Sequence, residues 1–232
     1  MTDQQAFQSL NRMNRTMAQQ IIRALCFAQA NTDCANNERE AKKARMLERA
    51  GVGKRYFTAT TPNAKELADT IEETGSNLYI HGNVGGGKTY LACAIINELI
   101  FHHTCQFAFF TTLINDLMRY HDKTAGNLIR KCKTTDILVI DDIGKENIND
   151  FVLSQLFEVF NERNANLRPT IMTSNYSISE LFNRLARKGN TETAHAIISR
   201  ISDNVRIIKV DHHDRRIGTI SDNKNRQLNT TH

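Results

Sequence analysis

The chain has 232 residues, of which 40% are hydrophobic and 24% charged, and its formal charge is +5. This composition is typical of one globular domain with at most a small appendage, and it excludes a chain too polar to fold. Because no apolar run approaches the roughly 20 residues that cross a bilayer, and the N-terminus lacks the apolar region of a secretory signal, we expect a cytoplasmic protein without a membrane partner.

Residues 1–50 contain neither Pro nor Gly and predict two helices. The first carries an apolar stripe at spacings of three and four. The stripe consists of Leu10, Met13, Met17, Ile21 and Leu25. Residues 31–37 are expected to interrupt the helix, and the charged residues 38–50 form a second one that ends before Gly51. These two helices have too little apolar surface to form a stable domain alone, so they must pack on each other, on the main body or on a partner.

Residues 51–60 are expected to form a linker, and Thr61 is the predicted N-cap of the helix that follows. From residue 77 onward, strand and helix patterns alternate, which predicts an α/β fold with a parallel sheet flanked by helices. The expected strands are residues 77–82, 105–112, 136–142, 169–175 and 205–210. The expected helices are residues 89–102, 113–123, 127–133 and 149–166. The polar residues 218–232 are expected to be disordered.

A phosphate-binding loop follows the first expected strand. Residues 82–89 match the pattern G-x-x-x-x-G-K-[ST]. Glycines let backbone N–H groups converge on a phosphate at a helix N-terminus, Lys88 can reach the outer phosphates, and the Thr89 hydroxyl can bind a metal. A glycine-rich turn without a ligand is the alternative, but such a turn needs neither Lys nor Thr there. The predicted binding residues are Gly82, Asn83, Val84, Gly85, Gly86, Gly87, Lys88, Thr89 and Tyr90.

Polar residues also end two later strands. Asp141 and Asp142 follow the apolar residues 137–140, and Asn175 ends the next strand. Two adjacent carboxylates at the end of a buried strand are costly unless a cation compensates them. We therefore expect Asp141 to hold Mg²⁺ and Asp142 to orient the attacking water, with Asn175 beside them if the strands are neighbours. Taken alone, these residues could equally be a helix cap and turn residues.

Taken in order, these motifs resemble the AAA+ ATPase fold and, within it, the DnaC-type bacterial helicase loaders. The resemblance covers residues 50 to about 217 and rests on "GNVGGGKTYLACAIINEL", "DILVIDDIG", "PTIMTSN" and "IISRISD". It implies ATP and Mg²⁺ as cofactors, Asn175 as the sensor-1 residue and Arg200 as an arginine finger that reaches a neighbouring subunit's nucleotide. It also implies that Arg215, or else Arg216, is the sensor-2 arginine, and that no C-terminal helical lid follows.

The same resemblance divides the chain into regions and gives it partners. Residues 1–50 would dock on the replicative DNA helicase, 51–76 form a linker and helix, and 77–217 form the ATPase domain. The domain would assemble into a ring or helical oligomer and contact single-stranded DNA. DNA contacts are expected from a segment after the second strand, although a solvated basic helix explains its charge equally well. Its candidates are Arg119, Tyr120, Lys123, Arg130, Lys131 and Lys133.

Three functions stay open at this point. The first is an ATP-driven helicase loader with ATP acting as a switch. The second is an IstB-type ATPase that assists a transposase, because that family shares these motifs. The third is a small-molecule kinase, although we find no mobile arginine-bearing lid in the sequence. Many AAA+ proteins have Glu where this chain has Asp142, so we expect slow hydrolysis, and a turnover far above about 10 per second would contradict this.

Overall fold

A computed structural model describes residues 27, 29, 33–119, 126–146, 148–187 and 190–210. The chain forms two compact units, Met1–Arg45 and Met46–His232. The predicted apolar stripe from Leu10 to Leu25 and the predicted disordered tail lie outside the described residues. The expected absence of a C-terminal lid also concerns residues after Val210, where the description ends.

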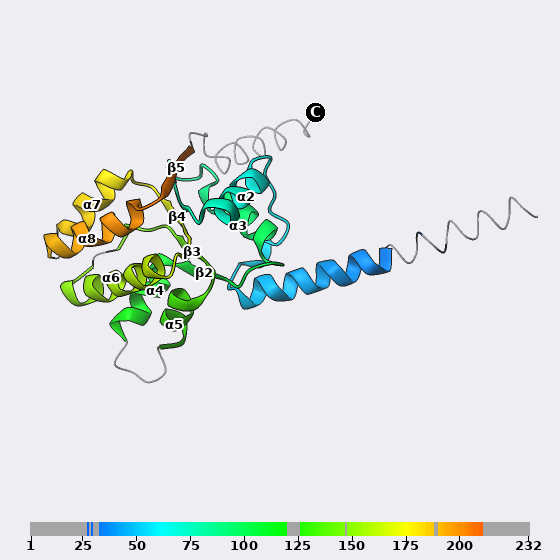
Figure 1. The fold of residues 1–232 in the computed structure, drawn as a ribbon, viewed down its shortest axis with the longest axis horizontal. Helices are drawn as coiled ribbons and strands as arrows, with labels where there is room; N and C mark the ends of the chain where they lie inside the picture. Colours follow the sequence, from blue (N-terminus) through cyan, green and yellow to red (C-terminus); the bar gives the residue numbers. More distant parts are fainter. Residues whose placement is uncertain are drawn as a thin grey trace, which may run out of the picture. The chain divides into compact units, whose positions relative to one another are not determined.

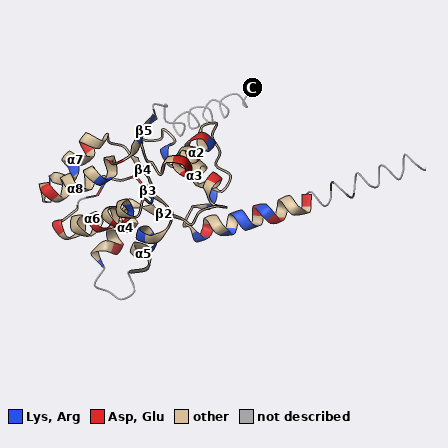
Figure 2. Cartoon of the chain, viewed as in Figure 1, with Lys and Arg blue, Asp and Glu red and all other residues tan. Residues whose placement is uncertain are grey.

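The described part of the first unit is helical. Residues 33–45 form a helix whose side chains are mostly exposed, and Lys, Arg and Glu of both signs alternate along it (Figure 2). The interruption expected at residues 31–37 is therefore wrong for residues 33–37. These residues include two asparagines but no Gly or Pro, and the helix propensity of each ordinary residue differs from alanine by less than about 0.7 kcal/mol.

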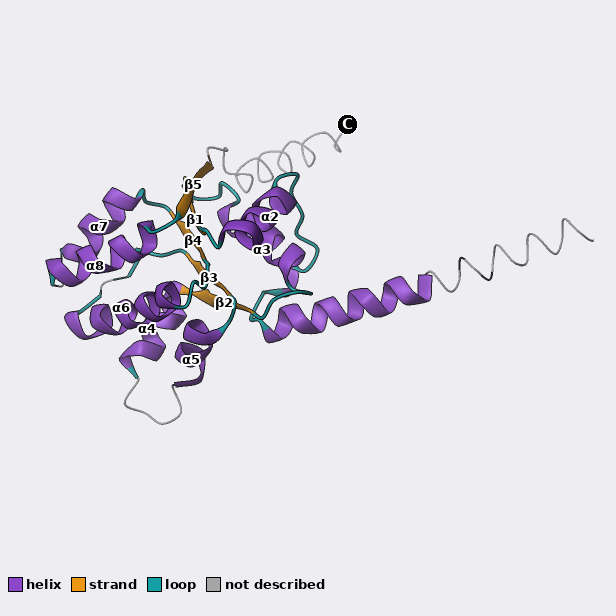
Figure 3. Ribbon diagram, viewed as in Figure 1, coloured by secondary structure: helices purple, strands orange, loops and turns teal. Residues whose placement is uncertain are grey.

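The second unit is built on a parallel sheet with the strand order β2-β3-β4-β1-β5 (Figure 3). The strands are β1 (Asn77–Gly82), β2 (Cys105–Phe109), β3 (Ile137–Asp141), β4 (Thr170–Ser174) and β5 (Val205–Val210). All five predicted strands and their parallel arrangement are confirmed. Every residue of β3 and β4 is buried, as expected for strands covered on both faces. Because β3 and β4 are neighbours, their carboxyl ends lie side by side.

Helices cover both faces of this sheet. Helices α2 and α3 lie on one face, and α4 to α8 lie on the other (Figure 1). Their bounds are α2 (Ala64–Thr74), α3 (Lys88–Leu99), α4 (Phe110–Met118), α5 (Gly126–Thr134), α6 (Asp150–Ala165), α7 (Ile178–Ala186) and α8 (Thr191–Ser202), with a short 3-10 helix, η1 (Lys54–Tyr56), ahead of them. No helix among the described residues is long and apolar enough to cross a membrane.

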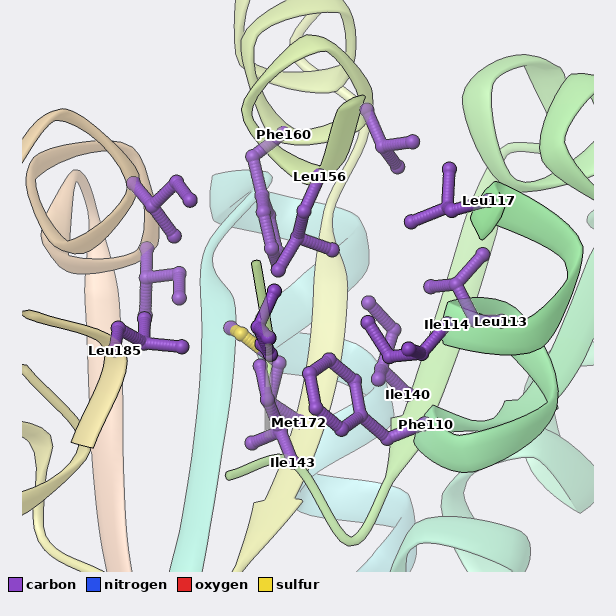
Figure 4. Packing of buried hydrophobic residues seen from close by; sticks show 14 of the residues in the cluster. Phe110, Leu113, Ile114, Leu117, Ile140, Ile143, Leu156, Phe160, Met172 and Leu185 are labelled. Atoms are coloured by element: carbon purple, nitrogen blue, oxygen red, sulfur yellow. The ribbon is translucent and has the colours of Figure 1, made fainter. Parts of the chain in front are cut away.

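The strand side chains divide between two cores with the expected period of two. On β3, Ile137 and Val139 pack toward α2 and α3, whereas Leu138 and Ile140 pack toward α4 to α8. Figure 4 shows the core between the sheet and α4 to α8, where side chains from α4, α6 and the strands converge. Its labelled members are Phe110, Leu113, Ile114, Leu117, Ile140, Ile143, Leu156, Phe160, Met172 and Leu185.

One charged side chain is buried at the amino ends of the strands. Arg163 of α6 is only 1% exposed, and its Nε donates to Thr170 Oγ1 at 2.9 Å. Its other nitrogens donate at 2.7–3.1 Å to carbonyl groups in the segments that precede β3 and β4. These acceptors are Cys132, Thr135, Asp136 and Pro169. Burial lowers the pKa of Arg163 to about 10, so this side chain remains a cation at neutral pH and joins α6, β3 and β4.

The structure departs from the sequence predictions at the start of the second unit. Residues 51–60 pack into the core instead of forming a loose linker, since Val52 and Ala59 are only 5% and 4% exposed. The N-cap of α2 is Asn63, not Thr61 as predicted, because Thr61 and Pro62 enter a turn closed by Ala64 N donating to Thr61 O at 3.1 Å. Proline fits such a turn because its φ angle is already fixed.

Two further differences concern helices. The second strand ends at Phe109, and Phe110 already belongs to α4, so the predicted strand is too long by its last residues. Helices α7 and α8 were not predicted as elements. A signal for α7 was present, because Ser177 and Glu180 form a capping box in which each side chain binds the other residue's backbone N–H.

Candidate nucleotide-binding site

The glycine loop connects β1 to α3 and requires glycine at two positions. Gly82 has φ 147°, and a Cβ there would collide with the carbonyl oxygen of Val210 on the neighbouring strand. Gly87, the N-cap of α3, has φ 91°, which lies in the left-handed region that disfavours other residues. The loop therefore places the N-terminus of α3, with its partial positive charge, at the carboxyl end of β1.

Lys88 is the first residue of α3 and lies against this loop. It is only 7% exposed, and its Nζ donates to the carbonyl oxygens of Gly82 at 2.9 Å and Asn83 at 2.7 Å. The ammonium group is thus held beside the same loop whose amides would bind phosphate. A lysine in this position supplies a point charge for an outer phosphate.

Thr89, Asp141 and Thr173 form a cluster between α3, β3 and β4. Thr89 Oγ1 donates to the Asp141 carboxylate at 2.9 and 3.1 Å, and Thr173 Oγ1 donates to Asp141 Oδ1 at 2.6 Å. Asp141 is only 4% exposed, and burial raises its pKa, although both hydroxyl hydrogen bonds act in the opposite direction. A charged carboxylate here is costly without a cation, which is the chemistry that a Mg²⁺ ligand needs.

Asp142 and Asn175 lie together at the ends of β3 and β4. Asn175 Nδ2 donates to Asp142 Oδ1 at 3.3 Å, and Lys145 forms an ion pair with Asp142 Oδ2. Asp142 has φ 67°, a left-handed conformation unusual for a residue other than glycine, and its N–H donates to Thr173 Oγ1 at 2.9 Å. Such strain clusters at functional sites, where the surrounding structure must hold it.

A cavity of about 840 Å³ lies over the glycine loop. From the site it is lined by residues 84–89, Asp142, Lys145, Thr173 and Asn175, whereas Asp141 is buried behind it. Arg55, Tyr56, residues 60–63 and residues 208–210 of β5 also line it. The volume is within the about 300–1,000 Å³ of small-molecule sites. A cavity of this size lined by loop amides and by cations suits a nucleoside triphosphate.

The other predicted binding residues lie around the mouth of this cavity. Val84 is 60% exposed, and Tyr90 accepts a hydrogen bond from Thr60 N at 3.3 Å through its hydroxyl. Arg200 does not join the site of its own chain. Its Nε donates to Asn161 Oδ1 of α6 at 3.2 Å, and it is not among the residues that line the cavity. Arg215 and Arg216 lie outside the described residues.

The basic candidates for DNA contact are only partly described. Arg130 and Lys131 are exposed on α5, whereas Lys133 lies 3.7 Å from Glu162 and is half-buried. Arg119 follows α4, and Tyr120 and Lys123 are outside the described residues.

Sequence reasoning missed Thr173, Lys145 and the cavity-lining residues Arg55, Tyr56 and 60–63. Thr173 stands two residues before Asn175, so alternation along a strand places both side chains on one face, and this signal could have found it. Lys145 could have been noted because it follows the two aspartates closely. No local pattern marks Arg55, Tyr56 or residues 60–63, which reach the cavity only through the tertiary fold.

A family model described as IstB-like ATP binding protein matches residues 35–222. The chain belongs to this family. The replicative helicase loader DnaI of Bacillus subtilis is 30% identical to this chain over 149 residues, 61% of this chain and 48% of DnaI. A putative ATP-binding protein in an insertion sequence of Mycobacterium tuberculosis is 29% identical over 105 residues, 44% of this chain and 42% of that protein. This IstB-like chain therefore spans about half the length of the curated relatives it matches.

Solved structures give the same fold for this IstB-like protein. A crystal structure of DnaI superposes with a TM-score of 0.58 at 26% identity, covering 64% of this chain and 84% of that one. The structure of DnaA of Aquifex aeolicus bound to AMPPCP superposes with a TM-score of 0.55 at 18% identity, covering 76% of this chain and 56% of DnaA. The predicted AAA+ fold of the P-loop class, with a parallel sheet flanked by helices, is confirmed, and ATP is the ligand of this family.

Proposed function

We propose that this chain binds and hydrolyses ATP with Mg²⁺ at the cavity beside β1 and uses the nucleotide as a switch in loading a replicative DNA helicase onto single-stranded DNA. One observation carries the nucleotide part of this proposal. Thr89 and Asp141 are hydrogen-bonded at the carboxyl end of the sheet, directly beside the glycine loop and the paired Asp142 and Asn175. This arrangement supports neighbouring phosphate, metal and water sites at the carboxyl ends of β1, β3 and β4.

Each residue has a defined part in the proposed chemistry. The loop amides and Lys88 bind the phosphates, and Thr89 and Asp141 hold the metal. Bound Mg²⁺ would neutralise phosphate charge and polarise the terminal phosphoryl group. Asp142 and Asn175 orient the water that attacks this group. Since Asp142 replaces the longer Glu of many relatives of the AAA+ class, we expect slow hydrolysis that DNA or a partner accelerates.

The remaining catalytic group is proposed to come from a second copy of the chain. Arg200 lies on α8 and contacts Asn161 in its own chain, so its role as an arginine finger requires a neighbour in a ring or helical oligomer. Arg215 is proposed to contact the bound nucleotide as the sensor-2 residue. Residues 1–50 are proposed to dock on the helicase, and residues 77–217 to form the ATPase domain. The named loaders among the relatives support this assignment.

The loading function is tested by co-purification with the replicative DNA helicase of the same cell, in ATP and then in ADP. We expect both the wild-type chain and Lys88→Ala to form a complex with the helicase. Release of the helicase should depend on the nucleotide only for the wild-type chain. ATP turnover is measured alongside, with and without single-stranded DNA and without any small-molecule acceptor. Failure to retain the helicase in either nucleotide would refute the loading function and leave ATP binding untouched.

A second function is favoured by a specific observation. The matching family model carries the name of an insertion-sequence protein, and a relative is an ATP-binding protein of an insertion sequence. An ATPase that assists a transposase on target DNA is therefore the alternative. Parallel pull-downs with a transposase of that insertion-sequence class and with the helicase distinguish the two functions, because each predicts only one retained partner.

A further inference from the structure

The carboxylate proposed to orient the attacking water is already bound to a cation of the same chain. Lys145 forms an ion pair with Asp142 Oδ2, and Asn175 Nδ2 donates to Asp142 Oδ1 at 3.3 Å. Both oxygens of Asp142 therefore have a partner. We propose that Lys145 restrains Asp142 and slows ATP hydrolysis. This inference rests on the proposed function, because it assigns a regulator to the same site.

The turn that carries Lys145 is fixed by four hydrogen bonds. The N–H groups of Asp142 and Ile143 both donate to Thr173, at 2.9 Å each, to its hydroxyl and its carbonyl respectively. The Ile143 carbonyl accepts from Ser174 Oγ at 2.8 Å, and the Gly144 carbonyl accepts from Arg184 Nε at 2.6 Å. With its backbone groups held in this way, the turn brings the side chain of residue 145 back to residue 142.

The conformation of this turn is specific and costly. Asp142 has φ 67° and Gly144 has φ 98°, so two residues within three positions are left-handed. A Cβ at Gly144 would meet Leu181 Cδ1 at 2.8 Å, which makes glycine necessary there. Arg184 also lies over the Tyr176 ring, 4.3 Å from its centroid, and so links the turn to the segment that follows Asn175. The pairing of Lys145 with Asp142 is thus a consequence of a rigid turn.

The size of the restraint follows from exposure of the pair. The side chains of Lys145 and Asp142 are 46% and 36% exposed, so solvent screens their attraction. Exposed ion pairs are worth about 0.2–1 kcal/mol, and removing this one should raise kcat by at most about fivefold. Rising salt should also raise the kcat of the wild-type chain, because salt screens the attraction between Lys145 and Asp142. The Debye length falls from about 10 Å at 0.1 M to about 3 Å at 1 M.

The experiment measures ATP turnover at saturating Mg·ATP, without DNA, for Lys145→Ala and for the same change in an Asp142→Asn background. We expect Lys145→Ala to raise kcat about two- to fivefold with KM little changed, and to have no effect once Asp142 is replaced. Rising salt should bring the wild-type kcat toward that of Lys145→Ala. Lys65→Ala, which removes the same charge from an exposed position of α2 outside the cavity, should behave as wild type.

The outcomes separate the two proposals. If Asp142→Asn lowers turnover to a measurable residual rate but Lys145→Ala leaves kcat unchanged or lowers it, the restraint is wrong and the proposed ATPase stands. A lowered kcat would indicate that Lys145 assists the phosphate instead. If Asp142→Asn is as active as wild type, or if purified chain binds no adenine nucleotide in calorimetry, the proposed site fails and the restraint fails with it.

Discussion

Thr173 offers a sharp test of the proposed metal site because its hydroxyl is hydrogen-bonded to the side chain of Asp141 and to the backbone of Asp142. Its hydroxyl donates to Asp141 Oδ1 at 2.6 Å and accepts from Asp142 N at 2.9 Å, and the residue is only 1% exposed. Thr173→Val keeps the shape of the side chain and removes both bonds. Loss of such a supporting partner typically lowers metal affinity about 10- to 100-fold, and we expect that range for Mg²⁺.

The assay is a Mg²⁺ titration of the binding of a fluorescent ATP analogue. Thr173→Ser is the matched control, because it retains the hydroxyl, and it should titrate within about threefold of wild type. Urea unfolding of each variant accounts for any loss of folded protein. If Thr173→Val shows the wild-type Mg²⁺ midpoint while remaining folded, the Asp141–Thr173 bond does not prepare a metal ligand, and the reasoning is refuted.

The same substitution has a pH signature with a definite sign. Burial raises the pKa of Asp141, whereas the Thr173 hydrogen bond lowers it by favouring the charged form. Removing the hydroxyl therefore raises that pKa further, and Mg²⁺ binding in Thr173→Val should require a higher pH than in wild type. The raised pKa also means that ionising Asp141 costs the metal-free protein stability as pH rises through this pKa, a cost that bound Mg²⁺ should offset.

Three other substitutions test separate parts of the structure. Lys88→Ala should weaken ATP binding about 10- to 100-fold in calorimetry while its circular dichroism stays native, because a charge-assisted bond is lost. Arg200→Ala should leave ATP binding intact but lower hydrolysis at least about tenfold at high protein concentration, and an unchanged rate would remove its assignment as the finger. Arg163→Met should lower the free energy of unfolding by about 3–5 kcal/mol in urea, since it leaves four carbonyls without their donor; a loss under about 1 kcal/mol would contradict this.

The parts of the fold that follow from local signals were predictable. Apolar runs located all five strands, and the glycine loop with Lys88 and Thr89 placed the phosphate site at the first strand–helix junction. The proximity of Asn175 to Asp142 also followed, because it required only that two consecutive parallel strands be neighbours. In each case the information lies within a few residues along the chain.

The parts that depend on distant contacts were not predictable. Residues 51–60 have the composition of a linker, yet Val52 and Ala59 are buried because the segment crosses the face covered by α2 and α3. The side-chain partners of Thr173 are likewise set by where β4 lies against β3. A left-handed Asp142 has no sequence signal, since aspartate adopts this conformation only when the surrounding bonds impose it.

The geometry separates nucleotide binding from hydrolysis within one chain. The loop, Lys88, Thr89 and Asp141 come from the β1–α3 junction and the end of β3 of the same chain, so a single copy carries these groups proposed to bind Mg·ATP. The groups proposed for hydrolysis are not ready in the same way, because Asp142 is paired with Lys145 and Arg200 is bonded to Asn161 on α6. A lone chain should therefore bind ATP and hydrolyse it slowly, with a neighbour's arginine supplying most of the acceleration and release of Asp142 adding at most about fivefold. This is the behaviour that a timed switch needs.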